Sequence, residues 1–297
     1  MKRILKLCFP LLISLCLLLA TSCTKYDNSS SGLISDNSQL GNTSDYSNDA
    51  LKAHYLDVGQ GDSIFLELPN KETMLIDSGT FENADKIIKY IKDLKYSKID
   101  YVVGTHPHAD HVGALADVLK AFDIGKIYMP DATTTGFTYE NLLKTIKEKG
   151  MKITRAKAGV NIFSGNDFTA EMIAPVNDSY DDLNNYSAVI KITYKAKTFL
   201  FMGDAETKSE GEITASVKAD VIKIGHHGSS SSTSVSFLKK VSPKYAVISV
   251  GAGNSYGHPT KQTLDRLNSV GCQVFRTDLL GTIVISSDGE SIHVKHK

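Results

Sequence analysis

The chain has 297 residues, 33 basic and 33 acidic side chains, and a hydrophobic content of 41%. This composition is ordinary for a folded domain. The balanced charge gives no overall electrostatic argument for a nucleic-acid partner, but it does not exclude a local basic patch. Three of the four cysteines lie within the first 23 residues, which excludes a disulfide framework in the rest of the chain. The remaining one, Cys272, lies in a strand-like run, where we expect a buried, unreactive thiol.

The first 23 residues have the three parts of an export signal. Basic side chains come first, residues 11–19 form an apolar run that is short for a membrane span, and small residues precede Cys23. The end of this stretch resembles a bacterial lipobox, with Ala20 where leucine is more usual. It implies a lipoprotein-type signal peptide over residues 1–22 and lipidation of Cys23. A simple secretory signal is the alternative.

Residues 23–50 are rich in Ser, Asn and Asp. Such a segment buries too little apolar surface to offset the entropy cost of ordering it, so we expect a disordered tether. The tether would hold a folded domain, residues 51–297, at the outer face of the bacterial cell membrane, or leave it secreted if Cys23 carries no lipid. No second long apolar run follows in the chain, so we do not expect a polytopic channel.

Hydrophobic periodicity divides the folded part into alternating strands and helices. An antiparallel meander opens it, and Thr260 is expected to cap a late helix. The expected strands are 53–58, 63–68, 73–76, 101–104, 124–129, 152–155, 168–173, 188–194, 198–202, 220–224, 245–250, 273–276, 282–286 and 291–294, and the expected helices are 84–94, 112–121, 139–149, 235–241 and 260–267.

The densest chemical motif is the loop from Thr105 to His111, between an expected strand and an expected helix. His106 and His108 are two residues apart, so in an extended loop both can face one metal ion. Asp110 and His111 follow on a turn and can face a second ion. Imidazole and carboxylate ligands together suit zinc or a similar divalent metal.

Other Asp and His residues follow other expected strands. They are Asp77, Asp204, the pair His226 and His227, and His258. Because functional loops of layered α/β folds gather at one edge of the sheets, these residues predict one composite site. Asp204 is well suited to bridge two ions, and either His226 or His227 can complete the second. Two such ions would activate a water molecule for hydrolysis without a covalent enzyme intermediate.

Taken together, the motifs resemble the metallo-β-lactamase fold superfamily and, more narrowly, the soluble hydrolase domain of ComEC-type competence proteins. The resemblance covers essentially residues 51–297. It implies an α/β fold, a four-layer αβ/βα sandwich of two mixed sheets with helices on the outer faces. The stretches that carry it are residues 56–63, 106–111, 185–187, 202–204, 226–229 and 253–259.

The resemblance also implies a role for each site residue. His258 would donate a hydrogen bond to a phosphate oxygen or a leaving group, or would be only a turn histidine. Asp77 would orient the metal loop through hydrogen bonds. The other implied roles are metal binding by His106, His108, Asp110, His111, Asp204 and His227, and catalysis by Asp110, His226 and His258. The hydroxyl-rich run that begins at Ser229 is expected to contact phosphate oxygens, with a flexible polar loop or a helix cap as the alternative, and Asn185 is a further candidate for substrate binding.

One departure concerns the first metal position. Many superfamily members have a further histidine before the bridging aspartate, but none lies between His111 and His226 here. The nearest polar candidate, Asn185, would be a weak ligand. We therefore expect one or two divalent ions, Zn²⁺ or Mn²⁺, with the first ion held less firmly.

The function expected from these features is an extracytoplasmic phosphodiesterase. Its substrate would be DNA, as the likeness to competence proteins implies, or an envelope phosphodiester such as a teichoic-acid-like polymer. Hydrolysis of a lactam, lactone or thioester on the same fold is the first alternative. A weakly active, tethered binding module is the second.

Overall fold

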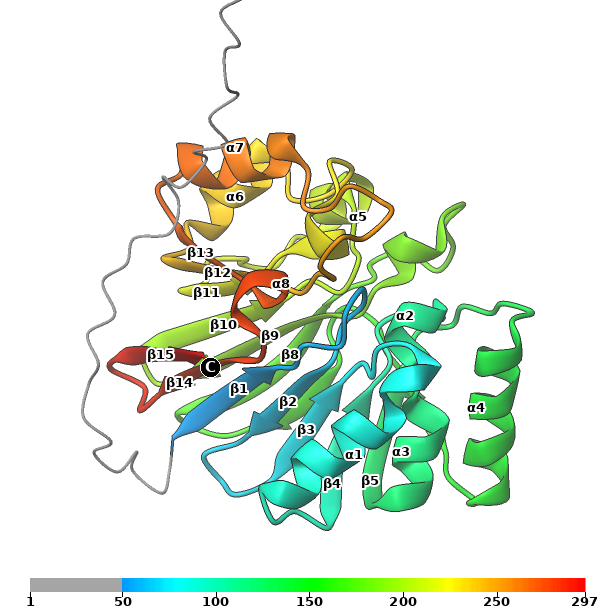
Figure 1. Ribbon diagram of the computed structural model, residues 1–297. Helices are drawn as coiled ribbons and strands as arrows, with labels where there is room; N and C mark the ends of the chain where they lie inside the picture. The colour runs from blue at the N-terminus through cyan, green and yellow to red at the C-terminus, as the bar shows by residue number, and fades with distance from the viewer. Residues whose placement is uncertain (1–49, 297) are drawn as a thin grey trace, which may run out of the picture. The chain divides into compact units, whose positions relative to one another are not determined.

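The computed structural model describes residues 50–296. The expected signal peptide, most of the expected tether and the expected lipidation site at Cys23 lie outside the described residues. Figure 1 shows the arrangement of the described elements. In chain order they are β1 Leu51–Tyr55, β2 Ile64–Glu67, β3 Thr73–Ile76, η2 Phe81–Asn83, α1 Ala84–Asp93, β4 Lys98–Val103, α2 Ala109–Val112, α3 Leu115–Ala121, β5 Asp123–Met129, α4 Phe137–Glu148, β6 Ile153–Arg155, β7 Asn161–Ser164, β8 Phe168–Ala174, η3 Leu183–Tyr186, β9 Val189–Tyr194, β10 Lys197–Phe201, α5 Thr207–Glu212, β11 Val221–Lys223, η4 Gly225–Gly228, α6 Val235–Val241, β12 Tyr245–Ile248, α7 Lys261–Ser269, β13 Gln273–Arg276, α8 Thr277–Leu280, β14 Ile283–Ser287 and β15 Ile292–His296.

The strands form two mixed sheets. The first has the order β15-β14-β1-β2-β3-β4-β5-β6, and the second has the order β13-β12-β11-β10-β9-β8-β7. In the first sheet pairing is antiparallel up to β3 and parallel from β3 to β6. The second sheet is parallel from β13 to β10 and antiparallel from there to β7. Each sheet therefore has a parallel half, whose strands end at a common edge.

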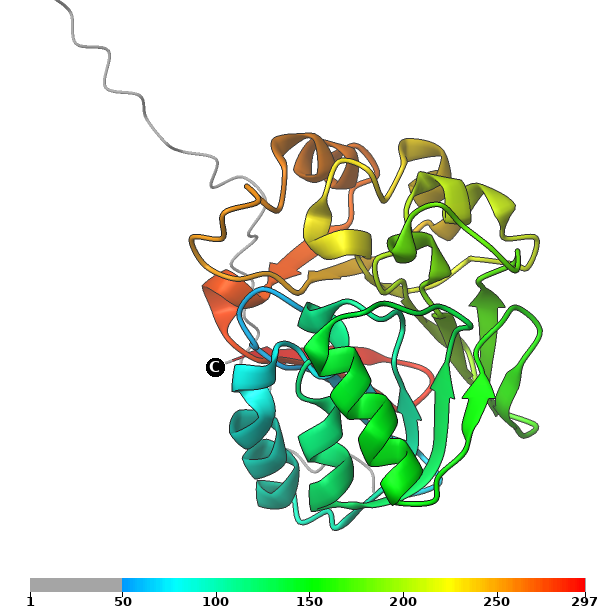
Figure 2. The same ribbon diagram turned by 90° about the vertical axis from the view of Figure 1, so that its right-hand side faces the viewer.

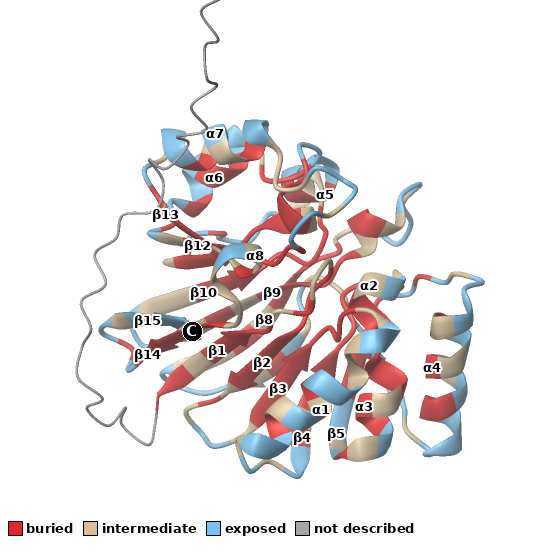
Figure 3. Cartoon of the chain, in the orientation of Figure 1, coloured by how far each residue is buried: buried red, intermediate tan, exposed pale blue. Residues whose placement is uncertain are grey.

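Apolar side chains fill three layers between and outside the sheets. Along β2, Ile64 and Leu66 point into the core between the two sheets, whereas Phe65 points to the helices of the outer face. The helices α1, α3 and α4 cover the outer face of the first sheet, and α6 and α7 cover that of the second (Figures 1 and 2). Figure 3 shows the strands buried in the middle of this arrangement. The expected four-layer αβ/βα sandwich is confirmed.

The two sheets meet through large side chains. The rings of Tyr55 and Phe201 stack across the core with centroids 6.2 Å apart.

Cys272 is buried as expected, and burial raises the pKa of its thiol to about 11. Within residues 50–296, no helix is long and apolar enough to cross a membrane.

Most expected elements are present, and the differences have local causes. The helix expected over residues 112–121 is interrupted, since α2 ends at Val112, α3 begins at Leu115, and the Gly113 amide between them bonds to the Gly79 carbonyl at 2.9 Å. The sequence also failed to predict β7, α5 and α8. Helix α5 has too few apolar side chains to give a helical period.

Candidate metal centre

The site lies at the edge where the parallel strands of both sheets end. Asp77 directly follows β3, and the loop with His106 and His108 follows β4. From the second sheet, Asp204 comes shortly after β10 and His227 lies in η4, just after β11. Residues distant in sequence meet here because the carboxyl ends of neighbouring parallel strands share one edge.

Asp77 holds the histidine loop in place. Its carboxylate accepts hydrogen bonds from the Thr105 amide and hydroxyl, each at 2.7 Å, and from His111 Nδ1 at 2.7 Å. All three residues are fully buried. The bond to Nδ1 leaves His111 Nε2 facing the centre of the site. The structure thus places Asp77 where an orienting residue is expected.

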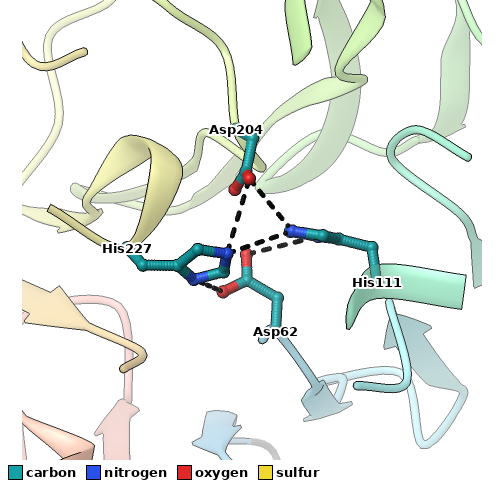
Figure 4. A group of neighbouring side chains, drawn as sticks. All are labelled: Asp62, His111, Asp204 and His227. Atoms are coloured by element: carbon teal, nitrogen blue, oxygen red, sulfur yellow. Dashed lines mark hydrogen bonds and ion pairs between the residues drawn. The ribbon is translucent and has the colours of Figure 1, made fainter. Parts of the chain in front are cut away.

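Four imidazoles converge on a single oxygen, Asp204 Oδ2 (Figure 4 shows two of them). The Nε2 atoms of His111 and His227 lie 3.2 and 3.4 Å from this oxygen. Those of His226 and His106 lie at 3.8 and 3.9 Å. A shared carboxylate oxygen among imidazole nitrogens is the geometry expected of a bridging ligand.

The remaining ligand candidates complete two groups around this oxygen. Asp110 Oδ2 lies 3.3 Å from His227 Nε2, next to His111. On the other side, His106 Nε2 lies 2.9 Å from His108 Nδ1. All six residues expected to bind metal therefore lie together.

Asp62 and Lys223 are two site residues whose roles the sequence reasoning missed. Both are fully buried, and their side chains form an ion pair. Lys223 Nζ also donates to the Gly203 carbonyl at 3.0 Å and lies 4.0 Å from Asp204 Oδ1. The sequence feature that could have indicated this pair is a single lysine at the end of an apolar strand. Lysine is almost never fully buried without a partner.

Asp62 lies behind the ligands, although its carboxylate is close to both central histidines. Its oxygens are 3.4 Å from His227 Nδ1 and 3.9 Å from His111 Nδ1 (Figure 4). These are the ring nitrogens that face away from Asp204. Asp110 instead approaches Nε2. Asp62 is therefore placed to orient the rings, and Asp110 is placed where a metal ligand is expected.

Glycine is required where the Asp62 loop meets the metal loop. Gly61 has φ +138°, and a Cβ there would run into the Asp110 carbonyl oxygen. The same carbonyl accepts a hydrogen bond from the Asp62 amide at 3.1 Å. The close approach of the two backbones fixes Asp62 relative to the ligand loop.

The electrostatics of the site favour a cation. Burial disfavours the charged form of Asp204, but His111 and His227 outweigh it and hold its pKa well below the usual range. Burial likewise opposes charge on His111 and His227, yet Asp204 and the nearby carboxylates raise the pKa of both rings well above the usual value. The Nε2 proton that each ring then carries is the one that a metal ion would replace.

A further observation shows that the carboxylate and imidazole donors suit a divalent ion. Asp204 Oδ1 is buried and has no hydrogen-bond partner among residues 50–296, while Oδ2 faces the histidines. Asp62, His111, Asp204 and His227 form a compact group of ligand type, in which Asp62 approaches the two rings from their Nδ1 side. Imidazole and carboxylate donors of this kind bind Zn²⁺, Mn²⁺ or iron.

A cavity of about 300 Å³ opens onto these groups. His258 lies at its rim, with its ring 5.6 Å from that of His226 and 5.7 Å from that of Tyr256, on which it stacks. Tyr256 is 68% exposed. The residues that line the cavity are Gln60, His108, Ala109, Asp110, Asp204, His226, His227, Tyr256 and His258.

Two residues expected to contact substrate lie elsewhere. Asn185 is buried, and its amide bonds to the Ser209 N–H at 3.2 Å and to Glu206 at 3.4 Å. Ser229 bonds to the Ser231 hydroxyl at 2.9 Å. Neither lines the cavity. Asn185 bonds to Glu206, and Ser229 bonds to Ser231, which also bonds to Glu206, so both belong to the polar network that supports His226.

The chain is similar to known proteins in sequence and in fold. Residues 56–252 match the model of the metallo-beta-lactamase superfamily. The chain is 30% identical over 248 residues to ComE operon protein 3 of Bacillus subtilis, covering 77% of this chain and 32% of that protein. It is 32% identical over 232 residues to competence protein ComA of Neisseria gonorrhoeae, covering 76% of this chain and 31% of that protein.

The chain thus spans about a third of the length of these curated relatives. Among solved structures, the metallo-beta-lactamase fold protein YhfI of Bacillus subtilis matches with a TM-score of 0.51 and 14% identity, covering 82% of this chain and all of that one. That likeness shows the fold alone. With its fold, its Asp and His site and its sequence relatives, the chain belongs to the metallo-β-lactamase superfamily.

Proposed function

We propose that this chain is an extracytoplasmic, membrane-tethered phosphodiesterase that hydrolyses its substrate with a metal-activated water. The observation that carries the proposal is the convergence of four imidazoles on Asp204 Oδ2 at the base of an open cavity. A divalent ion held there would supply hydroxide at neutral pH and positive charge for the developing oxyanion.

The cavity residues suit a phosphoryl group. Burial and the neighbouring His226 and His227 lower the pKa of His258, so its ring is neutral at pH 7 and still offers one N–H to a phosphoryl oxygen. Asp110 also reaches the cavity. Burial opposes its ionisation, but His111 and His227 hold its pKa below the usual range, so it can accept a hydrogen bond from the attacking water.

The similarity to competence proteins makes DNA the first substrate to test, and a teichoic-acid-like polymer the second. The proposed location rests on the lipobox-like end of the leader at Cys23. Lipid on Cys23 would hold the domain at the outer face of the cell membrane.

The decisive experiment is a cleavage panel with the purified protein and Mn²⁺ or Zn²⁺. The panel contains linear DNA, bis-p-nitrophenyl phosphate, nitrocefin and a lactone. We expect metal-dependent cleavage of the diesters, reduced by more than about a hundredfold in Asp204→Ala because the shared ligand is lost. Asp265→Ala, an exposed carboxylate on α7, is the matched control and should keep full activity.

Each other result points to a different function. Cleavage of nitrocefin or the lactone without the diesters would replace the phosphodiesterase with the alternative hydrolase. Absence of cleavage of every panel substrate by the wild type and by Asp204→Ala alike, with circular dichroism unchanged, would favour a binding module.

A further inference from the structure

His226 and His227 are consecutive residues with an uncommon backbone conformation. Their φ angles are +47° and +52°, in the left-handed region that non-glycine residues rarely adopt. Such conformations are strained for non-glycine residues, and they cluster at functional sites. The effect here is that adjacent side chains, which an extended strand would point to opposite faces, both reach Asp204 Oδ2, at 3.8 and 3.4 Å.

The second nitrogen of His226 is anchored in the manner of a metal ligand. His226 Nδ1 lies 3.2 Å from Glu206 Oε1. Glu206 is itself held by the Ser231 hydroxyl at 2.6 Å and by the Asn185 amide at 3.4 Å. Metal-binding histidines almost always donate their other N–H to a carboxylate or a carbonyl.

The other converging imidazoles have equivalent supports. His111 Nδ1 bonds to Asp77 at 2.7 Å, and His227 Nδ1 bonds to the Ser249 carbonyl at 3.0 Å. His106 Nδ1 lies 3.1 Å from the Thr105 hydroxyl. His226 thus shares with these ligands both an anchored Nδ1 and an Nε2 directed at the shared carboxylate.

We propose that His226 is a metal ligand of the first position, together with His106, His108 and Asp204, while His227 serves the second. Two atoms bound to one ion at about 2.1 Å can be at most about 4.2 Å apart. Three pairs in this set lie within the limit, namely Asp204 Oδ2 with His226 and with His106, and His106 with His108 at 2.9 Å. The residue pair at 226–227 then supplies one ligand to each ion.

The proposal concerns the metal alone and does not depend on the substrate. The rival role for His226 is substrate contact, because its side chain is 24% exposed and its ring lies near that of His258. Metal counting separates the two roles, since a residue that only contacts substrate leaves the bound metal unchanged.

The test loads purified protein with Zn²⁺, dialyses it against metal-free buffer and counts retained zinc by mass spectrometry, with Zn²⁺ affinity measured by calorimetry. We expect two ions in the wild type and one in His226→Ala, with the weaker affinity reduced more than a hundredfold. Glu206→Gln should weaken the same ion by about ten- to a hundredfold, as for other supporting residues of metal ligands. His258→Ala, which removes an imidazole from the same cavity, should retain both ions.

The remaining outcomes overturn the proposal. In the first, the wild type and His226→Ala have equal zinc content and affinity. In the second, the wild type retains one ion and His226→Ala leaves that ion in place. In the third, a folded His226→Ala loses both ions. Circular dichroism establishes folding, and Glu206→Gln, which leaves the imidazole in place, provides a second reading if His226→Ala does not fold.

Discussion

At the scale of single residues, the charge balance of the site depends on one lysine. Lys223 is the buried ammonium group between Asp62 and the free oxygen of Asp204. Burial alone would raise the pKa of Asp62, but Lys223, with help from His227, holds it below the usual range. Because Lys223 lies beside Oδ1, Asp204 presents Oδ2 to the histidines.

Removing this ammonium group should be costly. In Lys223→Met the buried Asp62 carboxylate loses its partner, and we expect the free energy of unfolding to fall by about 3–5 kcal/mol. The double variant Asp62→Asn/Lys223→Met removes both charges and should recover a large part of the loss. Urea unfolding of the wild type, both single variants and the double variant measures the coupling. A Lys223→Met variant within about 1 kcal/mol of the wild type would contradict the assignment.

At the scale of elements, a polar network attaches α1 to the first sheet away from the metal centre. Glu67 on β2 accepts from His54 Nε2 at 2.9 Å and from the Tyr96 hydroxyl at 2.8 Å. His54 Nδ1 lies 2.9 Å from the hydroxyl of Tyr90 on α1. Burial raises the pKa of Tyr90 to about 12, so this hydroxyl keeps its proton and can donate to Nδ1, leaving Nε2–H for Glu67.

This network gives the fold a specific dependence on acid. Burial opposes ionisation of Glu67, but the hydrogen bonds from His54 and Tyr96 hold its pKa at about 2, below the ordinary 4.5. A pKa lowered by folding stabilises the protein above the ordinary pKa, and the contribution is lost as the pH falls from 4.5 towards 2. We expect Glu67→Gln to lose about 1–2 kcal/mol at neutral pH, after allowance for partial exposure to solvent.

The difference between Glu67→Gln and the wild type should shrink steadily below pH 4.5. Urea unfolding at a series of pH values measures it, and effects of acid on the metal centre cancel in the comparison. Glu171→Gln, at a more exposed glutamate 3.8 Å from Lys191, is the control and should show a small difference that changes little with pH. A Glu67→Gln difference that is constant from pH 7 to 3 would refute the role of the network.

At the scale of the whole molecule, the two sheets each supply part of one centre. The first sheet delivers Asp77 and the histidine loop, and the second delivers Asp204 and the His226–His227 pair. Their parallel halves end at the same edge, so a centre built there requires both sheets to fold and pack. Metal binding should therefore report on the integrity of the whole described domain.

Attachment to a membrane is a separate, whole-molecule prediction from the leader. If Cys23 carries lipid, Cys23→Ala should move the protein from the membrane fraction to the soluble or secreted fraction, because one residue supplies the anchor. Fractionation of cells expressing each form, with labelled palmitate incorporation, measures this. Cys272→Ala is the matched control and should keep the label. Equal label in Cys23→Ala and the wild type would exclude the lipoprotein assignment.

The sequence by itself determined most of the elements and which Asp and His residues meet at the site. Period-two and helical apolar patterns are local, so most strands and helices, with the Thr260 cap of α7, were predictable. The candidate ligands from His106 to His111 were predictable for the same reason, since they are contiguous and follow a strand. The placement of Asp204 and His227 beside them followed from one general rule, that strand ends share an edge.

Only the tertiary structure decided how the site is supported. Asp62 and Lys223 pair across a large sequence separation, and no local pattern encodes that contact. Asn185, in η3, bonds to Glu206 and does not line the cavity, because the direction of a side chain in an irregular segment depends on backbone angles that no local sequence pattern encodes. The same physical reason explains His226 and His227: two successive left-handed residues aim both rings at one carboxylate oxygen, and packing around the site maintains that conformation.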